Sequence, residues 1–256
     1  MSILRQFSLE GKIAVVTGSS RGIGRAIAAA LAEAGAAVTV NGRDPETTQN
    51  TATTIIAAGG QSLAVIADIS NATDVERLIE TTVANFGRLD ILVNNAAISP
   101  YYKPAETVTE TDCDEIMKTN LKSVFLCCQA AARVMIPQKS GRIINISSIG
   151  GTVALPRLLA YCSAKGGINQ LTRVLAVEWA PYQILVNAIA PGFIETDLTK
   201  GLRENPKHLA SLIRQVPLGR LGRPHEIVGA AIYLASDAAS YVTGQMLNVD
   251  GGWLAL

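Results

Sequence analysis

The chain has 256 residues, of which 48% are hydrophobic and 17% are charged, and its formal net charge is +1. The charged fraction lies below the ~25% of an average soluble domain, which predicts a large core and buried subunit contacts. The near-neutral balance, with no basic run or stripe, excludes the charge pattern expected of a nucleic-acid-binding protein.

Short β-branched runs alternate with longer segments of helical periodicity along the whole chain. Strands are predicted at residues 13–17, 37–41, 62–67, 90–94, 142–147, 184–189 and 245–249. Helices are predicted at residues 22–34, 45–58, 72–86, 111–136, 160–180 and 224–235, the fourth of them broken near its start. Strict alternation implies parallel strands joined by right-handed crossovers. The sequence therefore predicts one α/β domain over residues 1–256, a doubly wound parallel sheet of about seven strands with helices on both faces.

One segment, residues 196–217, interrupts the alternation after the sixth strand. It is rich in polar and charged residues, namely Lys200, Arg203, Glu204, Lys207 and His208, together with Pro206. Ligands of such sheets bind beyond the carboxyl ends of the strands. We therefore expect this segment to be a mobile lid over the ligand.

Residues 1–11 contain no apolar stretch and no small-residue cleavage site. The most apolar helical stretch, residues 121–136, is interrupted by Lys122, Gln129 and Arg133, which is typical of a core helix and not of a membrane span. We expect a cytoplasmic protein without a membrane partner.

No metal site is expected, because the cysteines and histidines lack ligand spacing. Buried free thiols are predicted for Cys113, Cys127, Cys128 and Cys162. His208 and His225 stand alone and are predicted to be surface or capping residues.

A glycine-rich segment, TGSSRGIG at residues 17–24, follows the first predicted strand and opens the first helix. Glycine permits a tight turn and a close approach to a pyrophosphate, while the free amides and dipole of the helix start favour an anion. The alternative is a plain strand-to-helix turn. The predicted phosphate-binding residues are Gly18, Ser20, Arg21, Gly22, Ile23 and Gly24.

The end of the second strand indicates which dinucleotide binds. An acidic residue there would accept hydrogen bonds from an adenosine ribose, whereas an arginine suits a 2′-phosphate. Gly42 takes the expected acidic position, Arg43 follows it, and Arg21 projects from the glycine turn. NADP is favoured over NAD, the alternative being that Arg43 is a solvated loop charge.

The third and fourth strands also end in polar residues. The Asp68 carboxylate is placed either to accept a hydrogen bond from the adenine amino group or to cap the helix beginning near residue 72. Residues 94–97, NNAA, would let the backbone press against the cofactor, and a simple asparagine-rich turn is the competing interpretation.

Tyr161 and Lys165 are four residues apart, which puts both side chains on one face of a helix. A nearby ammonium favours the anion of a tyrosine that normally ionises near pH ~10. Such a pair alone is common on solvated helix faces. Gly166 and Gly167 follow inside the same helix, and we expect a partner helix in an oligomer or the neighbouring sheet to approach closely there.

With Ser148 and Asn120 added, the chain resembles the short-chain dehydrogenase/reductase family throughout its length. The family's glycine turn falls on Thr17, Gly18, Gly22 and Gly24, its Tyr-x-x-x-Lys motif on Tyr161 and Lys165, its serine on Ser148 and its asparagine on Asn120. Ala97 replaces the usual glycine of Asn-Asn-Ala-Gly, and we expect this methyl group to shift the cofactor slightly without abolishing binding. The resemblance implies a Rossmann-type fold and further cofactor contacts at Ile69, Asn95, Ala96, Pro191, Gly192, Ile194 and Thr196.

The resemblance also implies a mechanism and an assembly. Tyr161 would pass the proton while hydride moves between nicotinamide and a carbonyl carbon. Ser148 would bind the carbonyl oxygen, Ser147 being the alternative, and Lys165 would lower the pKa of Tyr161 and hold the nicotinamide ribose. Asn120 would position a water. A homotetramer is expected, packed through the helix of Tyr161 and through residues 245–253.

The substrate is the least determined element. The predicted pocket wall is largely apolar, formed by Ile98, Tyr101, Ile149, Gly150, Ala154, Leu155, Pro156 and Phe193. No arginine is obviously placed to bind a carboxylate, which favours a neutral carbonyl or a polyol over a small keto acid. Residues 7–12 and 40–43 look similar to gluconate and polyol dehydrogenases, whereas residues 143–146 and 191–197 look similar to 3-oxoacyl-carrier-protein reductases.

The leading hypothesis is an NADP-dependent oxidoreductase that interconverts a ketone and a secondary alcohol. Alternatives are an NAD-dependent polyol dehydrogenase and a 3-oxoacyl-thioester reductase. A non-catalytic nucleotide sensor need not retain all four catalytic positions, and an epimerase or dehydratase of the extended fold would carry a C-terminal substrate domain. Both are therefore disfavoured.

Overall fold

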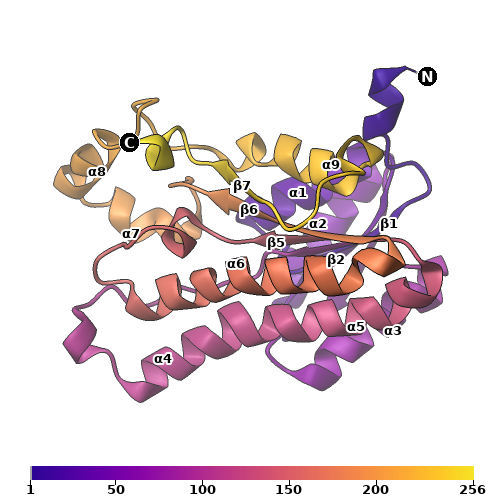
Figure 1. Ribbon diagram of the computed structural model, residues 1–256, viewed down its shortest axis with the longest axis horizontal. Coiled ribbons are helices and arrows are strands. Elements are labelled where there is room, and N and C mark those ends of the chain that lie inside the picture. Colours follow the sequence, from indigo (N-terminus) through magenta and orange to yellow (C-terminus); the bar gives the residue numbers. More distant parts are fainter. Residues whose placement is uncertain (1) are drawn as a thin grey trace.

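Seven parallel strands form a single sheet in the order β3-β2-β1-β4-β5-β6-β7 (Figure 1). The computed structural model describes residues 2–256. The strands are β1 (Ile13–Val16), β2 (Ala37–Gly42), β3 (Gln61–Ile66), β4 (Ile91–Asn94), β5 (Gly141–Ile146), β6 (Ile184–Pro191) and β7 (Met246–Val249). The predicted α/β class and sheet are confirmed. The strand order reverses between β1 and β4, so a ligand crevice is expected beyond the carboxyl ends of these two strands.

Helices cover both faces of the sheet. One face carries α1 (Gly22–Glu33), α2 (Pro45–Ala57) and α9 (Val228–Ala235), and the other carries α3 (Ala72–Phe86), α5 (Ser123–Gln138) and α6 (Leu159–Trp179) (Figure 1). Shorter helices are α4 (Glu110–Met117), α7 (Lys200–Arg203) and α8 (Pro206–Ile213). Within residues 2–256, none of the helices has both the length and the apolar character that crossing a bilayer requires.

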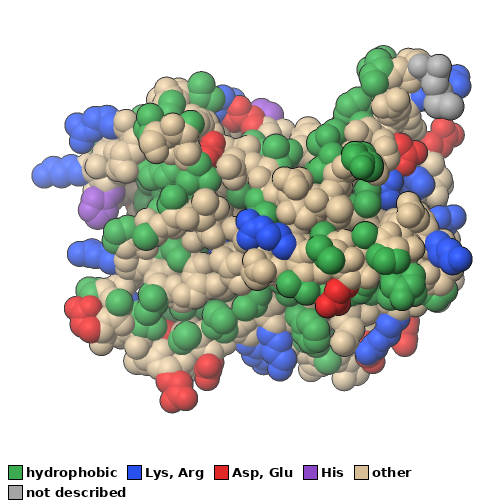
Figure 2. Space-filling model, in the orientation of Figure 1, with side chains coloured by type: hydrophobic (Ala, Val, Ile, Leu, Met, Phe, Trp, Pro, Cys, Tyr) green, Lys and Arg blue, Asp and Glu red, His purple; other side chains and the backbone are tan. Residues whose placement is uncertain are grey.

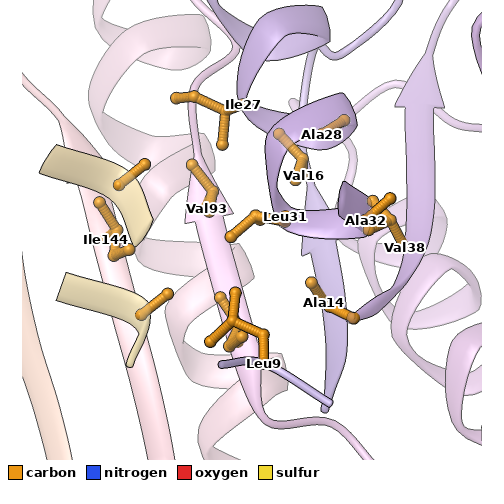
Figure 3. Packing of buried hydrophobic residues seen from close by; sticks show 14 of the residues in the cluster. Leu9, Ala14, Val16, Ile27, Ala28, Leu31, Ala32, Val38, Val93 and Ile144 are labelled. Atoms are coloured by element: carbon orange, nitrogen blue, oxygen red, sulfur yellow. The ribbon is translucent and has the colours of Figure 1, made fainter. Parts of the chain in front are cut away.

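The central strands are buried on both sides, as helices on both faces require. Every residue of β1 and β4 is buried. Val16 and Val93 pack beneath Ile27 and Leu31 of α1, with Val38 of β2 beside them (Figure 3). This packing fixes the ends of β1 and β4, from which the glycine turn and the segment after Asn94 emerge.

The helix predicted at residues 111–136 is broken, as expected, and the break is a π-helical turn over Lys118–Lys122. Such turns are rare inside helices and are frequently found at functional sites. Asn120 lies in this turn and is fully buried. The break therefore places a candidate catalytic residue in the protein interior.

Residues 196–217 contain the short helices α7 and α8. Leu212 and Val216 pack with Leu221, Phe193 and Trp253 in a separate apolar cluster. The Phe193 and Trp253 rings lie 5.0 Å apart, centroid to centroid. Trp253 also packs with Leu212 and Val216, so the end of the chain contacts this segment beside α8 (Figure 1).

The four cysteines are free thiols on α4, α5 and α6. Burial is confirmed for Cys127 and Cys128 but is wrong for Cys113 and Cys162, which are partly exposed. These two lie near the beginnings of α4 and α6, where less chain covers the helix than along the middle of α5. The predicted surface position of His208 and His225 is confirmed.

Candidate active site

The glycine turn packs directly against the end of β4. Gly18 has a φ of +60°, and a Cβ atom on it would lie 2.7 Å from the Ala96 Cα. A Cβ atom on Gly24 would lie 2.4 Å from the Asn95 Nδ2. Both distances are shorter than real Cβ contacts allow, so only glycine lets the turn and the β4 end touch.

Hydrogen bonds then lock this contact. The Thr17 hydroxyl accepts from the backbone N–H of Asn95 at 3.0 Å and of Ala96 at 3.2 Å. The Asn95 amide donates to the carbonyls of Thr17 at 3.0 Å and Gly18 at 2.9 Å. Two predicted cofactor contacts, Asn95 and Ala96, therefore hold the turn in place.

Two buried residues that the sequence interpretation missed also build the turn. The Asn41 Oδ1 accepts from the Gly18 N–H at 3.3 Å, and its Nδ2 donates to the carbonyls of Val65 and Ala67 at 3.2 and 3.1 Å. The Ser19 hydroxyl donates to the Val16 carbonyl at 2.6 Å and accepts from the Asn41 N–H at 3.0 Å. Together they connect the turn to β2 and to the end of β3.

The start of α1 leaves backbone donors for a ligand. The first amides of any helix lack intrahelical acceptors, and the N-cap of α1, Arg21, makes no side-chain cap hydrogen bond. The N-caps of α2 and α3, in contrast, are filled by the side chains of Asp44 and Asn71. The donors at Gly22 and its successors therefore fit the pyrophosphate of a dinucleotide.

The two cations predicted to select the nucleotide are exposed. Arg43 directly follows β2. Arg21 lies beside the glycine turn, and its Nη1 is 3.3 Å from the Asp197 Oδ2. This ion pair joins the turn to residues 196–217.

Asp68 does not cap α3, so that interpretation is wrong. Asn71 is the N-cap and accepts from the Thr73 N–H at 2.9 Å. The Asp68 Oδ1 instead accepts from the Ser70 N–H at 2.9 Å. Asp side chains commonly form such a local turn with the backbone two residues later. Ile69 beside it is buried.

The residues predicted after β6 meet the same end of the sheet. Pro191 ends β6, and a Cβ atom on Gly192 would lie 2.7 Å from the Asp250 Cα. Ile194 is buried and bridges to Gly222. The Thr196 Cγ2 would lie 3.6 Å from a Cβ atom on Gly22, so the segment after β6 reaches the glycine turn.

The two serines after β5 have different surroundings. The Ser147 hydroxyl donates to the Asn169 Oδ1 at 2.6 Å and lies 3.3 Å from the Lys165 carbonyl, so internal contacts occupy it. The Ser148 hydroxyl accepts from the Gly150 N–H at 3.1 Å, which leaves its own proton available. The geometry favours Ser148 over Ser147 as the group that meets a ligand.

Lys165 is 2% exposed, and its Nζ donates to the Ile146 carbonyl at 2.7 Å. The Nζ lies 5.7 Å from the centroid of the Tyr161 ring. Burial lowers the pKa of Lys165 to about 8. Burial also raises the pKa of Tyr161, and the interaction with Ser148 opposes this rise. The net effect on Tyr161 in this structure is a raised pKa and not the lowered one expected, because burial of the phenol dominates and the Lys165 ammonium is directed at the Ile146 carbonyl.

Asn120 holds the segment after β4. Its Nδ2 donates to the Ile98 carbonyl and its Oδ1 accepts from the Ile98 N–H, both at 2.8 Å. The side chain retains one N–H and one acceptor position for a water. The π turn also places Leu121 against α6, where a Cβ atom on Gly167 would lie 2.8 Å from the Leu121 Cδ2. The close approach at Gly167 is therefore made by the π turn of the same chain, and not by the sheet or a partner helix, whereas a Cβ atom on Gly166 would meet only the Gly151 carbonyl oxygen, at an ordinary 3.7 Å.

A shallow crevice, with room for about one water molecule, adjoins Tyr161. Its lining is Tyr101, Lys103, Val108, Asp112, Ile116, Arg157, Leu158, Leu159, Ala160 and Tyr161. Tyr101 is the one residue of the predicted pocket wall in this lining, and Arg157, in the turn before α6, is exposed beside it. Lys103 forms an ion pair with Asp112 and lowers the pKa of that carboxyl to about 2.

The low pKa of Lys165 has a consequence for stability. Between pH 8 and 10.5 the folded lysine is mostly neutral while the unfolded lysine still binds a proton, so the free energy of unfolding gains a term that rises with pH. We expect the stability of the wild type relative to Lys165→Met to increase by a few kcal/mol across this window. Urea denaturation of both proteins at pH 8, 9 and 10 measures this difference in the free energy of unfolding. Taking the difference cancels the contribution of titrating cysteines, which both proteins share. A difference that is flat or falls with pH would contradict the burial of an ammonium here.

Comparison with known proteins agrees with this geometry. A family model described as enoyl-(acyl carrier protein) reductase matches residues 18–254. The chain belongs to the short-chain dehydrogenase/reductase family. The resemblance drawn from the motifs is thereby confirmed, and members of this family are dehydrogenases and reductases.

Two relatives in the short-chain dehydrogenase/reductase family carry different names. A 3-oxoacyl-[acyl-carrier-protein] reductase of Synechocystis sp. is 44% identical over 96% of this chain and 98% of its own. A 2-dehydro-3-deoxy-D-gluconate 5-dehydrogenase of Escherichia coli is 42% identical over 99% of both chains. The crystal structure of a gluconate 5-dehydrogenase from Burkholderia cenocepacia, in complex with NADP and tartrate, superposes with a TM-score of 0.96, at 38% identity and with full coverage of both chains. Both resemblances seen in the sequence are therefore present among the relatives.

Proposed function

We propose that this protein is an NADP-dependent oxidoreductase that interconverts a ketone and a secondary alcohol, with Tyr161 as the general acid and base. The observation that carries the proposal is the assembly of Ser148, Tyr161 and Lys165 around the end of β5, beside a glycine turn with free helix amides. The nucleotide supplies or accepts the hydride. The protein must orient the substrate, and it must donate one proton in reduction or accept one in oxidation.

The proton is handled by the phenol of Tyr161. The phenol is protonated at neutral pH, so it has a proton to donate to a developing alkoxide during reduction. The Ser148 hydroxyl holds the same oxygen by a second hydrogen bond. In alcohol oxidation both steps reverse, with Tyr161 accepting the proton, and Lys165 is proposed to hold the nicotinamide ribose beside it.

The preference for NADP rests on Arg43 and Arg21. A guanidinium suits a 2′-phosphate, and a Cβ atom on Gly42 would lie 2.4 Å from the Thr48 Oγ1, so an acidic side chain does not fit there without rearrangement. The structural relative from Burkholderia cenocepacia contains NADP. The proposed contacts of Gly18, Ile69, Pro191, Gly192 and Thr196 lie at the same end of the sheet.

Substitution of Arg43 tests this preference. We expect Arg43→Leu to raise the Kd for NADP about 10- to 100-fold, as loss of a charge-assisted contact implies, and to leave the Kd for NAD unchanged. Isothermal titration with each nucleotide measures both constants, and Arg25→Leu on α1 is the matched control. Tighter binding of NAD than NADP by the wild type would reverse the assignment.

The reaction itself is tested by following absorbance at 340 nm with NADPH or NADP and a panel of ketones, hydroxy acids, polyols and acyl thioesters. Turnover of any member supports the proposal. An inactive protein that still binds nucleotide would be a sensor, and the same result in Lys165→Met would add weight to that reading.

We propose a cytoplasmic homotetramer in which residues 196–217 close over the substrate. Exposed apolar side chains on α5 and α6, namely Phe125, Val174 and Val177, offer one packing face, and Leu247 on the edge strand β7 offers another. Free thiols suit a reducing compartment. Light scattering gives the mass of the assembly.

A further inference from the structure

Asn169 lies on α6 one turn beyond Lys165 and two turns beyond Tyr161, and this spacing places the three side chains along one face of the helix. We propose that Asn169 is a positioning residue that fixes Ser148 relative to Tyr161 by holding the chain on both sides of that serine. This inference rests on the proposed function, because it gives Asn169 a role in the same reaction.

The Asn169 side chain makes one hydrogen bond on each side of Ser148. Its Oδ1 accepts from the Ser147 hydroxyl at 2.6 Å, and its Nδ2 donates to the Gly151 carbonyl at 2.9 Å. Asn169 is 5% exposed and Ser147 is 3% exposed, so water competes little for the bond between them. Loss of such a bond leaves a buried polar group without a partner, which makes the contact costly to break.

Ser148 begins the short turn that Asn169 holds. The Gly151 N–H donates to the Ser148 carbonyl at 2.9 Å, and the Gly150 N–H donates to the Ser148 hydroxyl at 3.1 Å. Gly151 is pressed against α6, since a Cβ atom on it would lie 2.8 Å from both the Lys165 carbonyl oxygen and the Asn169 Nδ2. Loss of the asparagine amide therefore frees the end of the turn that carries Ser148.

The direction of these bonds also separates the two serines. The Gly151 carbonyl can only accept, so the Asn169 Nδ2 faces it and the Asn169 Oδ1 faces Ser147. That oxygen takes the single proton of the Ser147 hydroxyl. The Ser148 hydroxyl accepts from the backbone, so its own proton remains available for a substrate oxygen. Asn169 therefore occupies one serine and orients the turn of the other.

The first test measures the turn itself and needs no substrate. Leucine has nearly the shape of asparagine and forms neither bond, so Asn169→Leu is the variant. Hydrogen exchange followed by mass spectrometry should show the amides of residues 149–153 exchanging about tenfold faster than in the wild type, because their hold on α6 is lost.

The matched control is Asn187→Leu, at a buried asparagine of β6 with the same number of side-chain bonds. Asn187 is 1% exposed, its Nδ2 donates to the Val242 carbonyl at 2.8 Å, and its Oδ1 accepts from the Gln245 N–H at 3.0 Å. These bonds join β6 to the segment before β7. Exchange at residues 149–153 should therefore be unchanged in this variant.

The second test measures the reaction by single-turnover kinetics at 340 nm with the best substrate of the panel. We expect Asn169→Leu to slow the chemical step about 10- to 100-fold, since a displacement of about 1 Å can cost that much, and to leave the Kd for NADP within about twofold. In a Ser148→Ala background the same substitution should cost less than about threefold, because the group that it positions is already absent. Asn187→Leu should not change the rate in either background.

Three results would overturn the inference. They are unchanged exchange at residues 149–153 in Asn169→Leu, faster exchange with an unchanged rate, and a loss of rate in the Ser148→Ala background as large as in the wild type or to below detection. If Asn169→Leu does not fold, Asn169→Ala replaces it, since the smaller side chain loses the same two bonds and leaves room for a water. The proposed function is judged separately by turnover of the wild type. A protein without turnover would reject the function, and the exchange measurement would then show by itself whether Asn169 holds the turn.

Discussion

Tyr161→Phe should lower kcat by about 10²- to 10⁴-fold, the range that a positioned general acid or base contributes. The variant removes one hydroxyl from a partly buried ring and keeps the packing of α6 against the crevice. We therefore expect the Kd for NADP to stay within twofold of the wild type and the melting temperature to change little. Single-turnover kinetics at 340 nm, with the best substrate of the panel, measures the chemical step.

The matched control is Tyr182→Phe, which removes the same hydroxyl from an exposed tyrosine after α6. It should retain full activity. A Tyr161→Phe protein with more than half of the wild-type kcat would show that the proton travels through another group, and Ser148 would be the next candidate.

Gly24→Ala should damage the glycine turn. The new methyl group would lie 2.4 Å from the Asn95 Nδ2 and 2.5 Å from the Gly18 carbonyl oxygen, so Asn95 has to give up its bonds to the turn. We expect a loss of about 1–3 kcal/mol in the free energy of unfolding, as for other overpacked sites. A rise in the NADP Kd of at least tenfold should accompany it, because the amides at the start of α1 move.

The comparison variant is Gly229→Ala in α9, where the added methyl group would meet no atom within 4 Å apart from its chain neighbours and its own helix backbone. Removing a helical glycine there should be neutral or stabilise the protein by up to about 1 kcal/mol. Urea denaturation and nucleotide titration of both variants decide the matter. If Gly24→Ala behaved like Gly229→Ala, the contact between the turn and β4 would not be tight in solution.

Much of the fold could be predicted because its signals are local. The β-branched runs gave all seven strands, since a strand covered on both faces must be apolar along its length. The short helices α7 and α8 were not predicted, because polar residues conceal the few leucines that pack against Trp253. The π turn was foreseen only as a break, since its position depends on the contacts of Asn120 with Ile98.

The residues of the candidate site also divide into those that local sequence signals mark and those that they do not. Tyr161, Lys165 and the glycines were found because a spacing or a turn marks them in the chain. Asn41 and Ser19 were missed because their bonds join segments about twenty residues apart, and no periodicity marks such pairs.

The ion pair between Arg21 and Asp197 contributes little to holding residues 196–217 in place. Both side chains are mostly solvated, at 75% and 66% exposure, and mobile ions screen charges in such surroundings. Contacts of Leu212 and Val216 with Phe193 and Trp253 must therefore set the resting position of the segment. Because such contacts weaken on cooling and are largely indifferent to dilute electrolyte, temperature should govern the opening of this segment more strongly than ionic strength.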